Sequence, residues 1–135
     1  MAALGTTLGS YVPNPLLLET AKTANYTVTA AENGTLFTNT GASTTAIVFT
    51  LPALAAGLVY EFQVVDNGSV TVASVAGSDI IYVNNATASS LAFSTASEKI
   101  GGRLLFRSNA AGTKWYVHNK SAGANAASGN RISVT

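Results

Sequence analysis

Groups that could perform acid–base, nucleophilic or metal chemistry are scarce in this sequence of 135 residues. It has no cysteine and a single histidine, His118. One histidine cannot form a multi-histidine metal site, and the lack of cysteine excludes disulfides, thiolate ligands and a cysteine nucleophile. His118 could act as a general base, but no serine lies in the Gly-x-Ser-x-Gly setting of a hydrolase nucleophile. The simpler interpretation of His118 is a partly exposed strand residue.

Carboxylates are the other candidates for catalysis or cation binding. They are Glu19, Glu32, Glu61, Asp66, Asp79 and Glu98. Glycoside hydrolysis needs two carboxyl groups facing each other across a sugar, and Glu61 and Asp79 could meet only through the tertiary fold. Asp66 and Asp79 lie in turn sequences, where aspartate bonds its own backbone, and Asp66-Asn67-Gly68 is only a fragment of a calcium loop. We therefore predict no catalytic, metal or cofactor site, and we expect a protein that is not an enzyme.

Short runs of alternating apolar and polar residues, separated by turn signals, fill residues 25–118. In the strongest run, 59–65 (VYEFQVV), Tyr60, Phe62 and Val64 share one face. The pattern predicts an all-β fold of about eight or nine short strands, either a β-sandwich or a small jelly-roll-like barrel. We expect mainly antiparallel sheets, because no segment is long enough for the helical crossovers that join parallel strands.

Composition divides the chain into three parts. Residues 1–24 form an expected extended N-terminal arm, residues 25–118 the β domain, and residues 119–135 a flexible C-terminal tail rich in Ala, Gly, Ser and Asn. Ile132 and Val134 alternate with polar residues, so the tail could add one last strand, on this chain or on a neighbouring subunit.

The arm combines closely spaced prolines with apolar side chains, which favours an extended path with few hydrogen bonds. It could be a disordered leader or a helical turn covering one end of the domain. We favour an arm that docks on a partner, because a solvated leader has little reason to keep such side chains. The predicted partner-binding residues are Tyr11, Val12, Pro13, Pro15, Leu16, Leu17 and Leu18.

Charge is sparse. Only 10% of the residues are charged, against roughly 25% in typical soluble domains. A surface of Thr, Ser and Ala loses little side-chain entropy when neighbours press against it. The net charge of +1 gives no electrostatic case for nucleic acid or a membrane surface. No secretion signal or membrane span is evident, so we expect a protein kept in, or assembled in, a cytoplasm.

Several basic residues would form one strip if 103–107 pairs with 114–118. The strip would contain Arg103, Arg107, Lys114 and Lys120, with Tyr116 and His118 within it. It could bind nucleic acid, but four charges are few, and we favour the rim of a protein interface. The residues predicted for this rim are Arg103, Arg107, Lys114 and Tyr116.

Five short motifs follow one another in the first half of the chain. They are YTVTA at 26–30, ENG at 32–34, FTNTGA at 37–42, FTLP at 49–52 and AGLVYEFQVVD at 56–66. Together they resemble a small β domain that is frequent in structural proteins of tailed bacteriophages. The resemblance covers about residues 25–83, and loosely continues to His118. Such domains occur in head decoration (cement) proteins and in tail fibres or spikes. The motifs mark turns and core residues, so the resemblance implies a fold and a setting but no active site.

The short single-domain chain and its proline-bearing arm favour the decoration role. The resemblance then implies a non-enzymatic protein of the virion, assembled in the host cytoplasm. It would bind the major capsid protein as a homotrimer, and would have no nucleic-acid, membrane or small-molecule partner. The alternative is a tail-fibre or spike module that binds host glycans through exposed Tyr82, Trp115 or Tyr116.

Overall fold

The computed structural model describes residues 18–75, 80–83, 86–93, 100–120 and 132–134. The elements are β1 (Leu18–Ala21), β2 (Tyr26–Thr27), the 3₁₀ turn η1 (Ala30–Glu32), β3 (Thr35–Thr38), β4 (Ile47–Thr50), β5 (Val59–Gln63), β6 (Val70–Ala73), β7 (Ile81–Val83), β8 (Ala86–Ala88), β9 (Ser90–Phe93), β10 (Arg103–Ser108), β11 (Trp115–Asn119) and β12 (Ile132–Val134). The described residues contain twelve strands, more than the predicted eight or nine, partly because several of them have only two or three residues.

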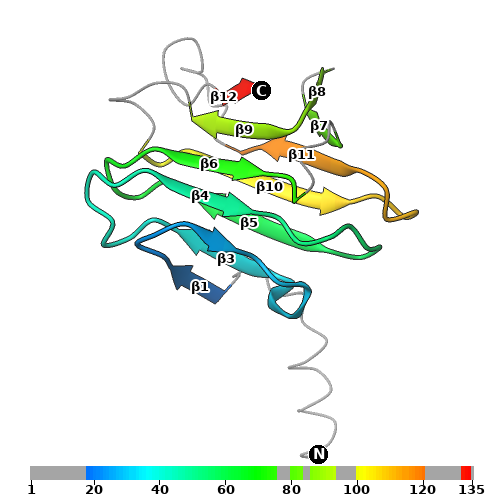
Figure 1. Ribbon diagram of the computed structural model, residues 1–135, viewed down its shortest axis with the longest axis horizontal. Coiled ribbons are helices and arrows are strands. Elements are labelled where there is room, and N and C mark those ends of the chain that lie inside the picture. The colour runs from blue at the N-terminus through cyan, green and yellow to red at the C-terminus, as the bar shows by residue number, and fades with distance from the viewer. Residues whose placement is uncertain (1–17, 76–79, 84–85, 94–99, 121–131, 135) are drawn as a thin grey trace, which may run out of the picture.

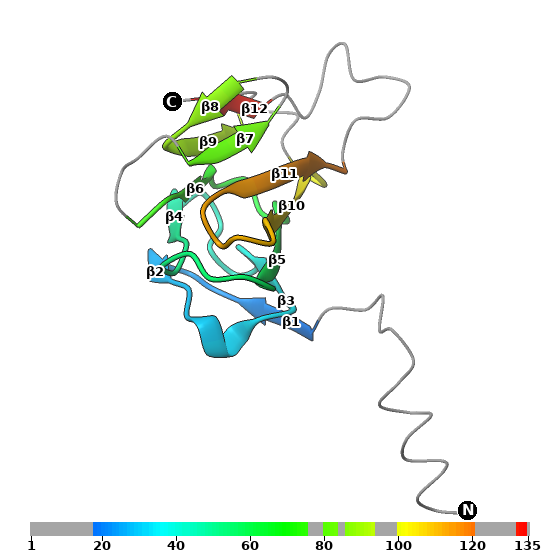
Figure 2. The ribbon, with the colours of Figure 1, turned by 90° about the vertical axis from the view of Figure 1, so that its right-hand side faces the viewer.

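The strands form two sheets stacked in layers (Figures 1 and 2). The seven-stranded sheet has the order β1-β3-β5-β10-β11-β7-β8, and the five-stranded sheet has the order β12-β9-β6-β4-β2. Figure 2 shows β4 and β6 in one layer, and β3, β5 and β10 in the other. The predicted β class and the sandwich-like layering are therefore confirmed for the described residues.

The first six strands alternate between the two sheets. β1, β3 and β5 lie parallel in the seven-stranded sheet, and β2, β4 and β6 lie parallel in the five-stranded sheet. Each strand therefore reaches its parallel neighbour by way of a strand in the opposite sheet. The chain from Leu18 to Ala73 forms three turns of a flattened coil, and we call this part the coil half.

The expectation of mainly antiparallel sheets is wrong, because five of the ten strand pairs among the described residues are parallel. That expectation assumed that a parallel connection requires a helix. In the coil half a strand of the opposite layer makes the connection instead. Turn sequences such as those at Gly34 (φ 84°) and Gly41 (φ 86°) therefore lead the chain from one sheet to the other and do not close hairpins.

The described residues between 80 and 120 form what we call the C-terminal half. The hairpin of β10 and β11 is antiparallel, and β10 also pairs antiparallel with β5. β7 joins the far side of β11 in parallel and pairs antiparallel with β8. The predicted pairing of 103–107 with 114–118 is thus confirmed, and it connects the two halves through β5.

Aromatic side chains fill the space between the sheets. Phe37 and Phe62 are direct partners on β3 and β5, and their rings stack with centroids 5.6 Å apart. Phe49 reaches them from the opposite sheet, 5.2 Å from Phe62, and Phe106 meets Phe62 edge-on at 5.4 Å. All four rings are inaccessible to solvent, so apolar burial and ring contacts hold the layers together.

Both predicted boundaries of the β domain move outward. β1 pairs with β3 before residue 25, so Leu18 belongs to the domain and not to an arm. At the other end, Asn119 completes β11, and the Lys120 amide donates to the Arg103 carbonyl. The last strand predicted in the tail exists as β12 and pairs with β9 of the same chain.

Candidate interaction surface

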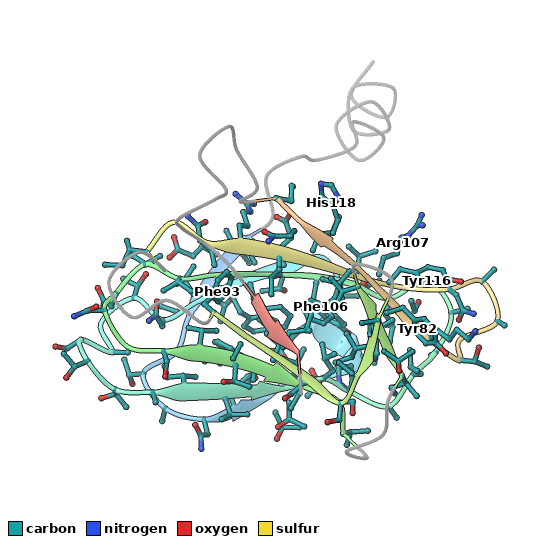
Figure 3. The ribbon with its side chains drawn as sticks, turned by 90° about the horizontal axis from the view of Figure 1, so that it is seen from above. Tyr82, Phe93, Phe106, Arg107, Tyr116 and His118 are labelled. Carbon is teal, nitrogen blue, oxygen red and sulfur yellow. The ribbon has the colours of Figure 1, made fainter. Side chains whose placement is uncertain are left out.

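The outer face of the seven-stranded sheet carries a groove of about 240 Å³, which we call the outer-face groove. Its lining residues are Leu105, Arg107, Tyr116, Val117 and His118. Leu105 and Arg107 alternate with the buried Leu104 and Phe106 along β10, so they face outward. Figure 3 shows Arg107, Tyr116 and His118 projecting outward, whereas Phe106 lies inside.

Strand register assembles the groove. Arg107 lies opposite Tyr116, and Leu105 lies opposite His118. In the parallel pair of β11 and β7, Tyr116 also lies beside Tyr82, and the two rings meet edge-to-face with centroids 6.3 Å apart. Tyr116 remains 43% exposed. A large aromatic ring is therefore held in a fixed position next to an exposed guanidinium group.

Lys114 extends the cationic character of this region. Its ammonium group lies 4.6 Å from the centroid of the Tyr82 ring, within the range of a cation–π contact. The structure therefore brings together three of the four residues predicted for an interface rim. They are Arg107, Lys114 and Tyr116, and they lie around β7 and β11. Tyr and Arg are the residue types most enriched at the energetic centres of protein interfaces.

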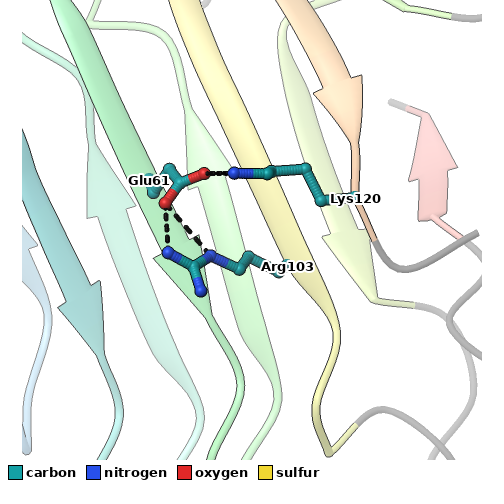
Figure 4. A network of polar contacts seen from close by, with 3 residues as sticks. All are labelled: Glu61, Arg103 and Lys120. Atoms are coloured by element: carbon teal, nitrogen blue, oxygen red, sulfur yellow. Dashed lines mark hydrogen bonds and ion pairs between the residues drawn. The ribbon is translucent and has the colours of Figure 1, made fainter. Parts of the chain in front are cut away.

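Arg103, the fourth predicted rim residue, binds Glu61. Its Nε lies 3.0 Å from Glu61 Oε2, its second guanidinium nitrogen contacts the same oxygen, and Lys120 Nζ contacts Oε1 (Figure 4). The Glu61 side chain is only 3% exposed. The predicted basic strip is therefore divided, because two of its cations, Arg103 and Lys120, neutralise a buried carboxylate.

Glu61 stays ionised in this setting. Burial alone would raise the pKa of its carboxyl group, but the hydrogen bonds and charges of Lys120 and Arg103 outweigh that effect and lower the pKa below its usual 4.5. The alternation pattern placed Glu61 on the outer face but gave no sign of its burial. Arg103 and Lys120 are 42 and 59 residues away in sequence, so only the fold brings them to Glu61.

The other described carboxylates also hold parts of the fold together. Glu19 accepts hydrogen bonds from the hydroxyls of Thr38 and Thr40, and Glu32 accepts from Tyr26 and Thr29. Asp66 Oδ2 accepts from the backbone amides of Gly41 and Ser43, at 2.7 and 3.1 Å. The prediction that Asp66 bonds its own turn is therefore wrong, because its carboxylate bonds a corner from the preceding turn of the coil. Asp79 lies outside the described residues, as does Glu98.

A buried asparagine completes this link between corners. Asn39 is inaccessible to solvent. Its Oδ1 accepts from the amides of Val65 and Asp66, and its Nδ2 donates to the carbonyls of Asp66 and Gly68. We call this arrangement the Asn39–Asp66 clasp. Sequence reasoning identified the Asn-Thr-Gly and Asp-Asn-Gly motifs as separate turns, and nothing in them indicated that they bind each other.

The remaining predicted contact residues divide into three groups. Trp115 is inaccessible in the core, so it is not a sugar-stacking residue, whereas Tyr82 and Tyr116 lie on the outer face. Leu18 is 76% exposed on the edge strand β1. The other arm residues, Tyr11 to Leu17, lie outside the described part of the chain.

Comparison with known proteins adds no identification. No protein-family model, curated protein or solved structure shows significant similarity to the chain. Among the described residues, no set of three or more His, Asp or Glu side chains is placed to hold a metal ion, and no helix is long and apolar enough to cross a membrane.

Proposed function

We propose that the chain is a non-enzymatic structural protein of a phage virion, which decorates and stabilises the capsid as a homotrimer bound to the major capsid protein. One observation carries the proposal. All four described carboxylates are bonded within the fold, whereas Tyr116 and Arg107 face solvent in a groove. These carboxylates therefore stabilise the fold. The exposed Tyr and Arg side chains are of types that are enriched at protein interfaces.

The positions of the phage-like motifs support the same reading. The motif at 32–34 and the end of the motif at 37–42 lie at corners of the coil half, and the end of the motif at 56–66 supplies Asp66 to the clasp. Their residue types are thus explained by the need to hold one corner against another. The resemblance is therefore one of architecture, as expected for a module that supplies shape and contact surface.

Binding to capsids tests the proposal directly. The full chain would be mixed with heads that lack it and sedimented, and light scattering would give the mass of the free protein. We expect a trimer that binds heads, with binding reduced by deletion of residues 1–17 and by the Arg107→Gln/Tyr116→Ala double substitution. A monomer that does not bind heads would contradict the proposal.

A glycan-binding module of a tail fibre or spike is the second candidate. The exposed ring of Tyr116 beside Tyr82 favours it, because aromatic rings stack on sugars. Binding of the chain to bacterial surface glycans, lost in Tyr116→Ala and without any binding to heads, would support this candidate over the first.

A further inference from the structure

We infer that the outer-face groove binds an extended, acidic segment of another protein, in which an aspartate or glutamate lies two residues from an apolar side chain. The inference rests on the proposed function, since it names the chemistry of the partner that such a structural protein would contact. It is carried by the charge, spacing and size of the groove.

Among the described residues, the exposed charged side chains around the groove are cationic. Arg107 lines it and Lys114 lies nearby, whereas none of the lining residues is acidic. The closest carboxylate in the register, Glu61 opposite Leu105 on β5, is buried beneath two cations. An anionic group would therefore be attracted to this face. The planar fork of an arginine matches a carboxylate with two parallel hydrogen bonds.

The spacing of the lining residues fits an extended peptide. Leu105 and Arg107 lie on the same face of β10, about 6.6 Å apart along the strand. Side chains two residues apart on an extended peptide have the same separation. An acidic side chain can therefore meet Arg107 while its neighbour two positions along covers Leu105. A volume of about 240 Å³ is below the roughly 300 Å³ at which small-molecule pockets begin, so it suits a few side chains of a larger partner.

Other occupants fit less well. A second copy of this chain has six carboxylates in all, and four of them are already bonded within its own fold. A sugar presents many hydroxyls, but no amide or carboxylate side chain lines the groove to bind them. Nucleic acid needs a longer row of cations than Arg107 and Lys114 provide.

A peptide titration followed by NMR tests the inference. The ¹⁵N-labelled full chain would be titrated with the peptide GSDTVDTVG, which presents two acid-x-apolar units, and with GSNTVNTVG, in which amides replace the acids. We expect the acidic peptide to shift amide signals of β10 and β11 at millimolar concentration or below, and the amide peptide to bind at least tenfold more weakly. Arg107→Gln should weaken binding of the acidic peptide about tenfold, the effect of one charged hydrogen-bond pair.

Lys22→Gln is the matched control, because it removes the same charge after β1, three strands from β10 in the sheet. It should change the affinity less than twofold, whereas Arg107→Lys, which keeps the charge but loses the fork, should be intermediate. Melting curves would show that each variant is folded.

Three results would overturn the inference: equal binding of the two peptides, no binding of either, or equal weakening by Lys22→Gln and Arg107→Gln. Preferential binding of sialyllactose or of an oligothymidylate in the same titration would also overturn it and would indicate a glycan or nucleic-acid site. If heads bind the chain but the peptides do not, only the inference fails. If the chain binds neither the peptides nor the heads, the proposed function fails as well.

Discussion

The coil half and the C-terminal half join short strands with different side chains. In the coil half, paired residues such as Leu18 and Thr35, or Ile47 and Val70, are roughly twenty residues apart in sequence. Amide side chains hold such distant segments together. Asn33, for example, accepts from the Val59 amide and donates to a carbonyl 24 residues away.

In the C-terminal half, the β10–β11 hairpin is closed locally. Asn109 accepts from the amides of Thr113 and Lys114, only four and five residues away. The hairpin needs no distant clasp, and Arg107 and Tyr116 on its outer face are exposed, whereas Arg103 binds Glu61. Among the described residues, the polar side chains that join distant segments therefore lie mainly in the coil half, whereas the exposed side chains of the outer-face groove lie in the C-terminal half.

Removal of the Asn39–Asp66 clasp should have the largest effect and is the strongest test of this difference between the two halves. Asn39→Ala leaves two amides and two carbonyls without their partner in hydrogen bonds that are buried or part-buried, and each such group costs about 1–3 kcal/mol. We expect a loss of about 4 kcal/mol in the free energy of unfolding, measured by urea denaturation. Asn109→Ala, the equivalent change in the exposed hairpin, should cost about 1 kcal/mol. Equal losses of unfolding free energy in the two variants would show that Asn39 and Asn109 stabilise the fold to the same extent.

Packing at the same corner gives the next largest effect. A Cβ added at Gly68 would lie 1.9 Å from the carbonyl oxygen of Thr45, so the two corners would have to separate. We expect Gly68→Ala to lose about 3 kcal/mol, as for severe overpacking. Gly34→Ala is the control, because open space surrounds Gly34 and its positive φ costs only about 1–2 kcal/mol. The difference between the melting temperatures of the two variants measures the cost of the steric clash at Gly68. A larger loss of stability in Gly34→Ala than in Gly68→Ala would contradict the predicted clash.

Glu61 links the two halves and should give an intermediate effect. Glu61→Gln leaves Arg103 and Lys120 without a charged partner, and because both are partly exposed we expect a loss of about 2 kcal/mol at neutral pH. The folded pKa of Glu61 is lowered, so its contribution is complete above the unfolded value of about 4.3. It is lost as pH falls through the lower folded pKa. The wild-type advantage should therefore disappear in acid, and an advantage that grows in acid would refute this account.

Substitutions in the outer-face groove should have the smallest effect on stability. Arg107 is exposed and Tyr116 is 43% exposed, so Arg107→Gln and Tyr116→Ala should change the free energy of unfolding by about 0.5 kcal/mol or less. Chemical denaturation checks this. A loss comparable to that of Asn39→Ala would mean that the groove residues hold the fold together, and the contrast between the halves would fail.

Much of the candidate surface could be predicted from the sequence. Alternation in RLLFR (103–107) puts Leu104 and Phe106 on one face and Arg107 on the other. The predicted pairing of 103–107 with 114–118 was enough to bring Arg107 near Tyr116. The burial of Glu61 and the hydrogen bonds of Asp66 to the Gly41 and Ser43 amides could not be predicted. Both depend on residues far away in sequence, and a turn motif is the same whether it closes a hairpin or leads to another sheet.

Local alternation was sufficient to identify most of the buried apolar side chains, though not the burial of Glu61, because alternation along a strand needs only local geometry. The sequence by itself also determined the β class and the low charge of the surface. Only the tertiary structure decided the parallel coil, the division of the basic strip and the Asn39–Asp66 clasp. The physical reason is that strand partners are chosen by backbone hydrogen bonds between distant segments, and those bonds are the same for every residue type except proline.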